Sequence, residues 1–175
     1  MNKDIEQIEQ HFEELAKRWP DLYQKANVDY FGVGIGWTGI IDTLCSLISY
    51  KVENAKRRLK FALECPESSP DPVYIPKLEK EIADALEELP TITQVKEKYG
   101  GLRFYIYGGT DEVHNYINFA ESMSYRVCEM CGAPGEPRSD GWTKTLCERH
   151  HRERQGDVKV PIVTSFPDGP RLAEE

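Results

Sequence analysis

Two pairs of metal-binding side chains recur at the same spacing near the C-terminal end of the sequence. Two residues separate Cys128 from Cys131, fifteen residues follow, and Cys147 and His150 repeat the two-residue gap. Such a gap lets one tight turn present two donors to the same ion, and zinc binds four sulfur or nitrogen donors in a tetrahedron. The pattern therefore predicts a structural Zn2+ site. Because four protein ligands leave no position for a reacting water, this zinc would stabilise the fold and do no chemistry.

Two alternatives to a zinc site stay open, and so does the identity of the fourth ligand. A disulfide would need an oxidising compartment, and no signal-peptide stretch at the start of the sequence indicates one. The number of cysteines, five, is also odd, so they could not all form pairs. A redox thiol pair is expected in a thioredoxin-like βαβ setting, and a second pair at ribbon spacing favours zinc instead. His151 could replace His150 as the fourth ligand, because adjacent histidines have similar reach, and only the spacing favours His150.

Charge and hydropathy argue against two classes of function. No apolar run reaches eighteen residues, so we expect no membrane span. The net charge of −8 and the pI near 5.1 count against direct nucleic-acid binding, because phosphate affinity depends on accumulated Lys and Arg. Residues 126–154 are near neutral, with six basic and five acidic side chains. A zinc finger that reads DNA would be more basic.

Helical periodicity covers most of the first 125 residues. Apolar residues recur every three or four positions in four stretches that end at prolines or open at capping residues. We predict helices over Ile5–Trp19, Thr38–Leu63, residues 77–89 and Asp111–Met123. On the second of these, Cys45 falls on the apolar stripe, where a buried thiol acts as a small hydrophobic residue.

A glycine-rich segment between a strand-like stretch at 28–31 and the second helix has the letters of a dinucleotide-binding fingerprint. It reads Gly34-Ile-Gly-Trp-Thr-Gly39. A Rossmann unit needs a second strand that ends in an acidic residue roughly 20 residues later. Lys51–Lys60 is instead helical and basic, and Trp37 would crowd a pyrophosphate. We therefore interpret the segment as a bend that packs a strand onto a helix, with Trp37 as an anchor.

Alternating apolar and polar residues between Thr91 and Tyr107 predict a β-hairpin with its turn at Gly100-Gly101. The predicted fold is α+β, with three or four helices packed on a small antiparallel sheet centred on hairpin 91–107. We expect an α+β core at 1–125, a zinc-binding module at 126–155 docked against it, and a proline-containing tail at 156–175.

One face of this hairpin has the composition of a site for a small anionic ligand. Positive charge, backbone N–H groups of a double glycine and an aromatic ring are what such a ligand needs. The alternative is a solvated sheet face with cross-strand pairs to Glu97. The predicted ligand-binding residues are Lys96, Lys98, Gly100, Gly101, Arg103, Tyr105 and the nearby Trp37.

Three motifs follow one another in a specific order. They are Gly36-Trp37 to Cys45, then Val95-Lys-Glu-Lys-Tyr-Gly-Gly-Leu-Arg-Phe-Tyr105, then Cys-Glu-x-Cys-Gly followed by Gly141-Trp142 and Thr145-Leu-Cys-x-x-His150. Over about residues 28 to 151 the chain thereby resembles a family of uncharacterised bacteriophage and bacterial proteins. The resemblance implies no established activity. It implies a phage or prophage accessory protein that acts in the bacterial cytoplasm.

No catalytic constellation emerges from the sequence. His11 and His114 lie on predicted helices, and neither Cys45 nor Cys65 has a paired base. We expect a non-catalytic binding protein that takes a small anionic, nucleotide-like ligand and modulates host processes or defence. One alternative is an adaptor or inhibitor that docks onto a host protein, such as one that binds nucleic acid through a basic site. A second alternative is an enzyme that acts on a nucleotide.

Overall fold

A computed structural model describes residues 3–23, 31–65, 67 and 73–156, and the fold is α+β as predicted. Residues 28–30 of the predicted strand-like stretch, residues 68–72 and residues 157–175 of the predicted tail lie outside the described residues. In chain order the elements are α1 (Lys3–Arg18), α2 (Pro20–Tyr23), β1 (Phe31–Gly32), the 3-10 helix η1 (Ile35–Trp37), α3 (Thr38–Glu64), α4 (Tyr74–Glu88), β2 (Thr91–Lys98), β3 (Gly101–Tyr107), α5 (Asp111–Ser124), β4 (Glu136–Arg138), β5 (Lys144–Leu146) and α6 (Glu148–Gln155).

The four predicted helices are present, with small shifts at their ends. α3 follows directly from η1, so Thr38 is its first residue, and the Thr38 hydroxyl donates to the carbonyl of Ile35 at 2.7 Å. α5 has a side-chain cap, because the Thr110 hydroxyl accepts from the backbone N–H of Val113 at 3.4 Å. In the described part of the chain, no helix is long and apolar enough to cross a membrane.

The predicted hairpin forms from β2 and β3, and its turn lies one residue earlier than predicted. Lys98 pairs with Gly101, so Tyr99 and Gly100 are the two turn residues. Both have positive φ angles, 54° and 78°, as a type I′ turn requires. The two-residue strand β1 pairs in parallel with β2 through Phe31 and Val95, so the sheet is mixed rather than wholly antiparallel.

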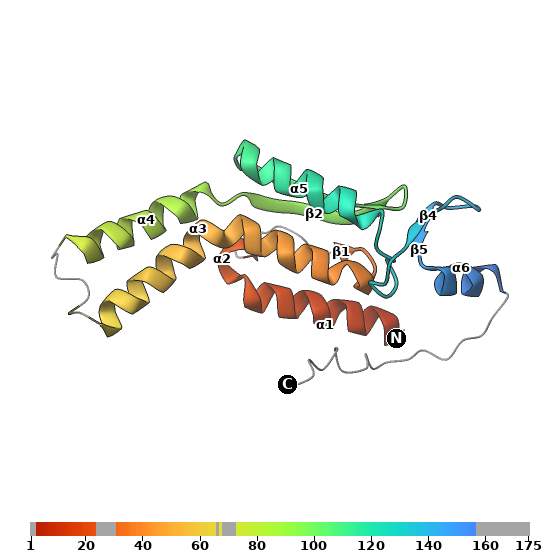
Figure 1. The fold of residues 1–175 in the computed structure, drawn as a ribbon, viewed down its shortest axis with the longest axis horizontal. Coiled ribbons are helices and arrows are strands. Elements are labelled where there is room, and N and C mark those ends of the chain that lie inside the picture. The colour runs from red at the N-terminus through yellow and green to blue at the C-terminus, as the bar shows by residue number, and fades with distance from the viewer. Residues whose placement is uncertain (1–2, 24–30, 66, 68–72, 157–175) are drawn as a thin grey trace, which may run out of the picture.

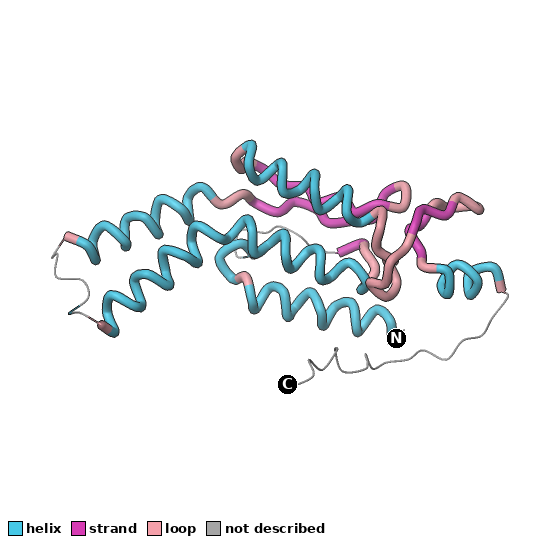
Figure 2. Tube along the Cα trace, viewed as in Figure 1, coloured by secondary structure: helices cyan, strands magenta, loops and turns pink. Residues whose placement is uncertain are grey.

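Helix α5 lies along the hairpin and covers the free edge of β3 (Figures 1 and 2). The backbone N–H of Leu102 donates to the Ser124 hydroxyl at 2.8 Å, and that of Phe104 donates to the Glu121 carboxylate at 3.0 Å. These side chains satisfy backbone groups that an exposed edge would offer to another strand. Beneath the sheet, α3 supplies the core with Ile41, Leu44 and Cys45, all at most 1% exposed.

The described residues extend in two directions from this core. α3 and α4 continue past the sheet as a pair of helices, here called the arm, which pack together through buried Ala55, Ala62 and Leu78 (Figure 1). At the opposite end lie β4, β5 and α6. The predicted metal ligands lie in the turn before β4, which contains Cys128 and Cys131, and at the start of α6, where Cys147 and His150 lie.

Candidate metal centre

The four predicted zinc ligands converge on one point, and their donor atoms all lie within 4.8 Å of one another. The sulfurs of Cys131 and Cys147 are 3.8 Å apart. The Nδ1 atom of His150 lies 3.4 Å from the Cys128 sulfur and 3.3 Å from the Cys147 sulfur. Three sulfurs and an imidazole nitrogen thus face one another across a short distance.

These distances fit a tetrahedral zinc ion. With zinc about 2.3 Å from sulfur and about 2.0–2.1 Å from nitrogen, a tetrahedron places two sulfurs about 3.8 Å apart and a sulfur and a nitrogen about 3.6 Å apart. The residues present therefore fit a metal ion with three thiolates and one imidazole, although the geometry alone does not name the metal.

Local backbone structure presents each pair of ligands. The amide of Gly132 donates to the carbonyl of Cys128 at 2.9 Å and closes a tight turn around the first pair. Gly132 has a φ of 75°, which favours glycine. Cys147 is the N-cap residue of α6, and the next turn of that helix brings His150 back beside it.

Burial and local hydrogen bonds shift the pKa values of three of the four candidate ligands. Burial raises the pKa of the Cys128 thiol to about 12. Burial acts in the same direction on Cys147, but backbone N–H groups at the start of α6 and the neighbouring thiols outweigh it, and its pKa is lowered. Burial and then the charge of Arg149 lower the pKa of His150, which favours the neutral ligand form. A metal ion would supply the positive charge that a buried Cys128 thiolate needs.

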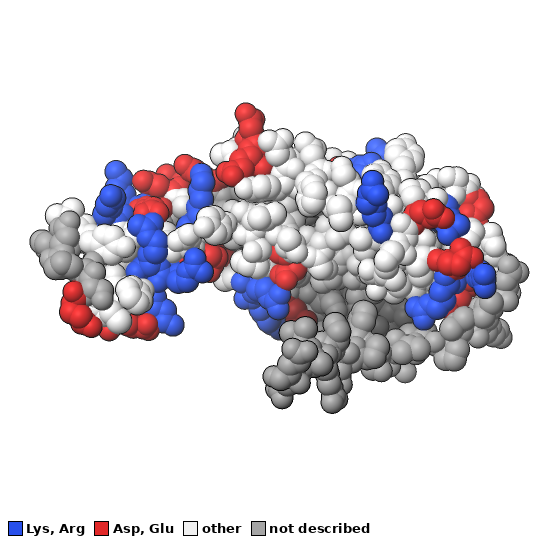
Figure 3. All heavy atoms as spheres, viewed as in Figure 1, with Lys and Arg blue, Asp and Glu red and all other residues white. Residues whose placement is uncertain are grey.

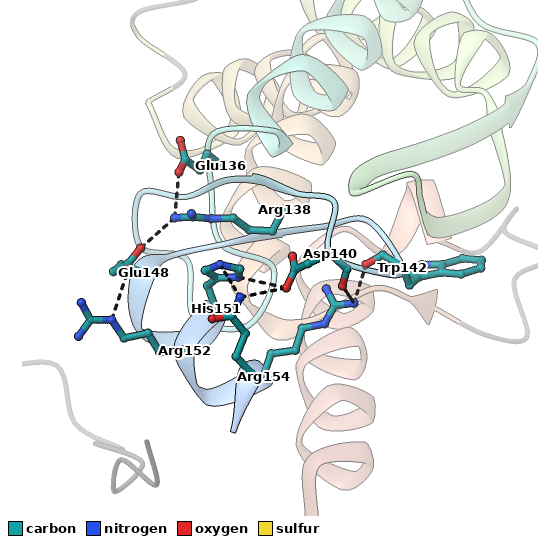
Figure 4. Close-up of polar contacts among 9 residues, drawn as sticks. Glu136, Arg138, Asp140, Trp142, Glu148, His151, Arg152 and Arg154 are labelled. Carbon is teal, nitrogen blue, oxygen red and sulfur yellow. Dashed lines mark hydrogen bonds and ion pairs between the residues drawn. The ribbon is translucent and has the colours of Figure 1, made fainter. Parts of the chain in front are cut away.

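The structure distinguishes His150 from His151. Of the two histidines, only His150 turns its ring into the cluster, and its Nε2 atom lies 3.2 Å from the Arg149 guanidinium and 3.6 Å from a carboxylate oxygen of Glu153. With a metal ion on Nδ1, the Nε2 atom would carry the proton, and the Glu153 carboxylate is the neighbour that could accept it. The Nδ1 atom of His151 lies 3.8 Å from Asp140, and its Nε2 atom is 3.2 Å from the Gln155 amide (Figure 4). His151 therefore ties α6 to the loop between β4 and β5.

Two arginines strengthen the same connection (Figure 4). Arg138 lies 2.9 Å from Glu136 and 3.1 Å from Glu148 at the start of α6. Arg154 donates to the backbone carbonyl of Trp142 at 2.7 Å. These contacts hold α6 against the loop even though the helix has no buried residue.

The backbone of the glycine-rich segment packs directly against the turn that contains Cys128 and Cys131, here called the metal turn. The amide of Gly36 donates to the carbonyl of Glu129 at 2.8 Å. A Cβ atom on Gly36 would lie 2.2 Å from the carbonyl oxygen of Cys128, and one on Gly34 would lie 2.3 Å from that of Glu129. These two glycines therefore let one backbone lie directly on another, and no phosphate is needed to explain them.

Trp37 anchors this contact, as the interpretation of a packing anchor predicted. Its side chain is 0% exposed, and its indole N–H donates to the carbonyl of Val127 at 2.8 Å, just before the first metal ligand. Sequence reasoning missed that this anchor serves the metal turn. No spacing rule relates the two segments, because 90 positions separate Trp37 from Val127.

The metal module also holds the tip of the hairpin. The hydroxyl of Thr145, which is fully buried on β5, donates to the carbonyl of Gly100 at 2.6 Å. The Glu97 carboxylate accepts from the amide of Gly100 at 2.7 Å and from the indole N–H of Trp142 at 3.0 Å. The four candidate ligands and the hairpin turn are thereby connected through β5.

The predicted ligand-binding residues are only partly brought together. Lys96 and Arg103 are cross-strand neighbours, and the Lys96 amine lies 5.2 Å from the centre of the Tyr105 ring. Arg103 is committed to its own chain, because it donates to the Tyr125 hydroxyl at 2.8 Å and lies 3.6 Å from Glu121.

Three of the predicted residues are not available to a ligand on this face. Trp37 is buried in the core, and the amide of Gly100 is already bonded to Glu97. Gly101 packs so closely on Tyr125 that an added Cβ atom would lie 2.3 Å from the ring. The accessible set is therefore Lys96, Lys98 and Tyr105, with Arg103 at its margin.

Comparison of the chain with protein-family models, with curated proteins and with solved structures finds no match. The function has to be inferred from the site itself.

Proposed function

We propose that this chain is a non-catalytic binding protein whose structural zinc ion holds a basic, aromatic surface in place. We call this surface the hairpin face, and it consists of Lys96, Lys98, Tyr99, Tyr105 and Tyr107. The observation that carries the proposal is that the two lysines of this face lie on tyrosine rings and form no ion pair with the described residues. Lys96 lies over Tyr105, and Lys98 lies 5.4 Å from the centre of the Tyr99 ring. Within the described residues, neither amine has a carboxylate within ion-pair distance.

Unpaired lysines on aromatic rings suit an anionic ligand with a planar group. The amines would bind phosphate or carboxylate oxygens, and the tyrosine rings would stack on a base. A small nucleotide-like molecule meets both requirements. The resemblance to phage and bacterial proteins supports a phage or prophage accessory role in the host cytoplasm, where capture of a nucleotide signal would modulate host defence.

A second candidate function is that of an adaptor or inhibitor that docks onto a host protein. Beside the hairpin face, Trp142 is 68% exposed, and within it Tyr107 is 78% exposed. Exposed tyrosine and tryptophan are typical anchors of protein interfaces. Small ligands prefer concave sites, whereas one hollow of the described residues lies between α3, the end of α4 and the start of α5, and another lies between α3 and α4. Neither includes a residue of the hairpin face.

Mass spectrometry of the protein purified from bacteria, first native and then denatured, separates these candidates. Release of a nucleotide from wild-type chain, and its absence from Lys96→Glu/Lys98→Glu, would support the first. Retention of the same compound by this variant would contradict it. Arg57→Glu/Lys60→Glu, at two exposed positions of α3, changes the net charge by the same amount and is the control.

A pull-down from the same lysate tests the second candidate. A stoichiometric host protein that is retained by wild-type chain and lost on Tyr107→Ala or Trp142→Ala would support it. Turnover of a released compound by the purified protein would overturn the non-catalytic proposal altogether.

A further inference from the structure

Helix α4 carries a short run of charges that is complementary to itself. Lys77, Lys80, Glu81 and Asp84 read as two positive charges followed by two negative charges. The run is symmetric about the point between Lys80 and Glu81. If a second copy of the helix lies antiparallel across that point, each lysine faces an acidic residue.

These charges share one exposed surface of the arm. Residues 77, 80, 81 and 84 recur at helical spacing, and together with residues of α3 they line a hollow of about 590 Å3. Lys77, Lys80 and Asp84 are exposed, and Tyr50 on α3, which is 60% exposed, lines the same hollow. Figure 3 shows Lys and Arg beside Asp and Glu over the end of the molecule formed by α3 and α4. We call this surface the arm face.

The described part of the chain leaves three of these four residues without an ion pair. Glu81 lies 2.8 Å from Arg58 on α3, but among the described residues Lys77, Lys80 and Asp84 have no ion-pair partner. Lys77 and Glu81, like Lys80 and Asp84, are four residues apart and could pair within the helix. That order, with the lysine first, is the less favourable one, and neither pair lies within ion-pair distance.

We infer that the arm face binds a second copy of this chain about a two-fold axis, with the two α4 helices antiparallel. Lys77 would then face Asp84 of the second copy, and Lys80 would face Glu81 of the second copy. The two-fold axis repeats both pairs, as an isologous interface requires. Tyr50 would supply the aromatic contact beside them.

The size of the arm face suggests a weak dimer. Fifteen residues of helix span about 20 Å, and two adjacent helices are about 20 Å wide. Such a footprint, about 400 Å2 per copy, lies below the range of stable specific interfaces and in the range of weak, transient ones. We therefore expect association that depends on protein concentration, with a dissociation constant on the order of micromolar.

Sedimentation velocity on the full-length chain over a range of concentrations tests this inference. Wild-type chain should shift from monomer to dimer as its concentration rises. Lys77→Glu/Lys80→Glu makes all four positions acidic and should weaken association about tenfold or more. Glu81→Lys/Asp84→Lys makes all four basic and should do the same. Glu53→Lys/Glu79→Lys changes the net charge as much as the second variant but lies off the arm face, so it should dimerise like wild type.

An equimolar mixture of the two charge-reversed variants is the decisive sample. Their arm faces are complementary, so a mixed dimer should form even though neither variant dimerises alone. Its formation also shows that both variants are folded, which matters because Glu81→Lys removes the partner of Arg58. The inference would be overturned if the wild-type chain stayed monomeric at every concentration. It would also be overturned if both charge-reversed variants dimerised like wild type, or if their mixture did not associate.

Discussion

The metal end and the arm of this protein are held together by different means. At the metal end, strands β4 and β5 have three residues each and α6 has no buried residue, so apolar packing contributes little. Four converging ligands and a set of polar contacts to the core take its place. The arm consists of long helices that pack through Ala55, Ala62 and Leu78, with ion pairs at its surface.

The difference determines how far a local change should spread. The metal turn lies on Gly34 and Gly36, and β5 holds the hairpin turn through Thr145. Loss of the metal should therefore loosen the core and the hairpin face together. Among the described residues, Ala55, Ala62 and Leu78 of the arm lie outside the main core cluster, so damage to the outer part of the arm should stay there.

The largest effect is expected from loss of a buried metal ligand. Cys128→Ser should lower the free energy of unfolding by at least about 4 kcal/mol, because structural zinc contributes more than this to small modules. Thermal denaturation with and without a chelator measures the effect. Cys65→Ser, outside the cluster, is the matched control and should behave like wild type. Equal stability of the two variants would contradict the structural role of the site.

A methyl group added at Gly36, against the metal turn, should give the next largest loss in the free energy of unfolding. Gly36→Ala should cost about 2–4 kcal/mol, because its Cβ atom would lie 2.2 Å from a backbone oxygen and 2.5 Å from a backbone nitrogen. Gly39→Ala is the control, since nothing lies within 4 Å of that Cβ position and alanine favours the helix. Chemical denaturation compares the two, and a neutral Gly36→Ala would show that the turn does not rest on this segment.

Damage to the arm should leave the metal end intact. Leu78→Ala removes a fully buried side chain and should cost about 2–4 kcal/mol. Hydrogen exchange should rise in α4 and in the outer half of α3, while zinc content and exchange in β5 stay unchanged. Faster exchange throughout the metal module would contradict the separation of the two ends.

The smallest effect is expected at the rim of the metal end. Trp142→Phe removes one exposed hydrogen bond to Glu97 and should cost less than about 1 kcal/mol. Thr145→Val removes the buried bond to Gly100 and should cost more. Denaturant unfolding of both variants ranks them, and the reverse order would mean that Trp142 supports the hairpin turn more than Thr145 does.

Local patterns predicted the four longer helices, the hairpin and the convergence of the four candidate ligands, but not α2, α6 or the short strands β4 and β5. The four ligands follow from spacing, because each pair depends on a single turn of the backbone. The helices and the hairpin follow from periodicity. The turn residues were predicted one position late, since Tyr99 has a positive φ that its residue type does not suggest.

Long-range contacts could not be predicted in the same way. The glycines at 34 and 36 are explained by a turn about 95 residues later in the chain, and periodicity contains no information on that contact. The predicted ligand residues were grouped by strand alternation, which is insensitive to burial by other elements. In the structure, Trp37 contacts Val127 and Gly101 packs on Tyr125. No local pattern predicts these two contacts.

Metal content tests the central claim most directly. Native mass spectrometry of wild-type chain, His150→Ala and His151→Ala, each purified without added metal, compares the three. We predict one zinc ion per wild-type chain and per His151→Ala chain, and a large loss of zinc from His150→Ala. A folded wild-type protein without metal, or zinc that is lost from His151→Ala and kept by His150→Ala, would contradict the account.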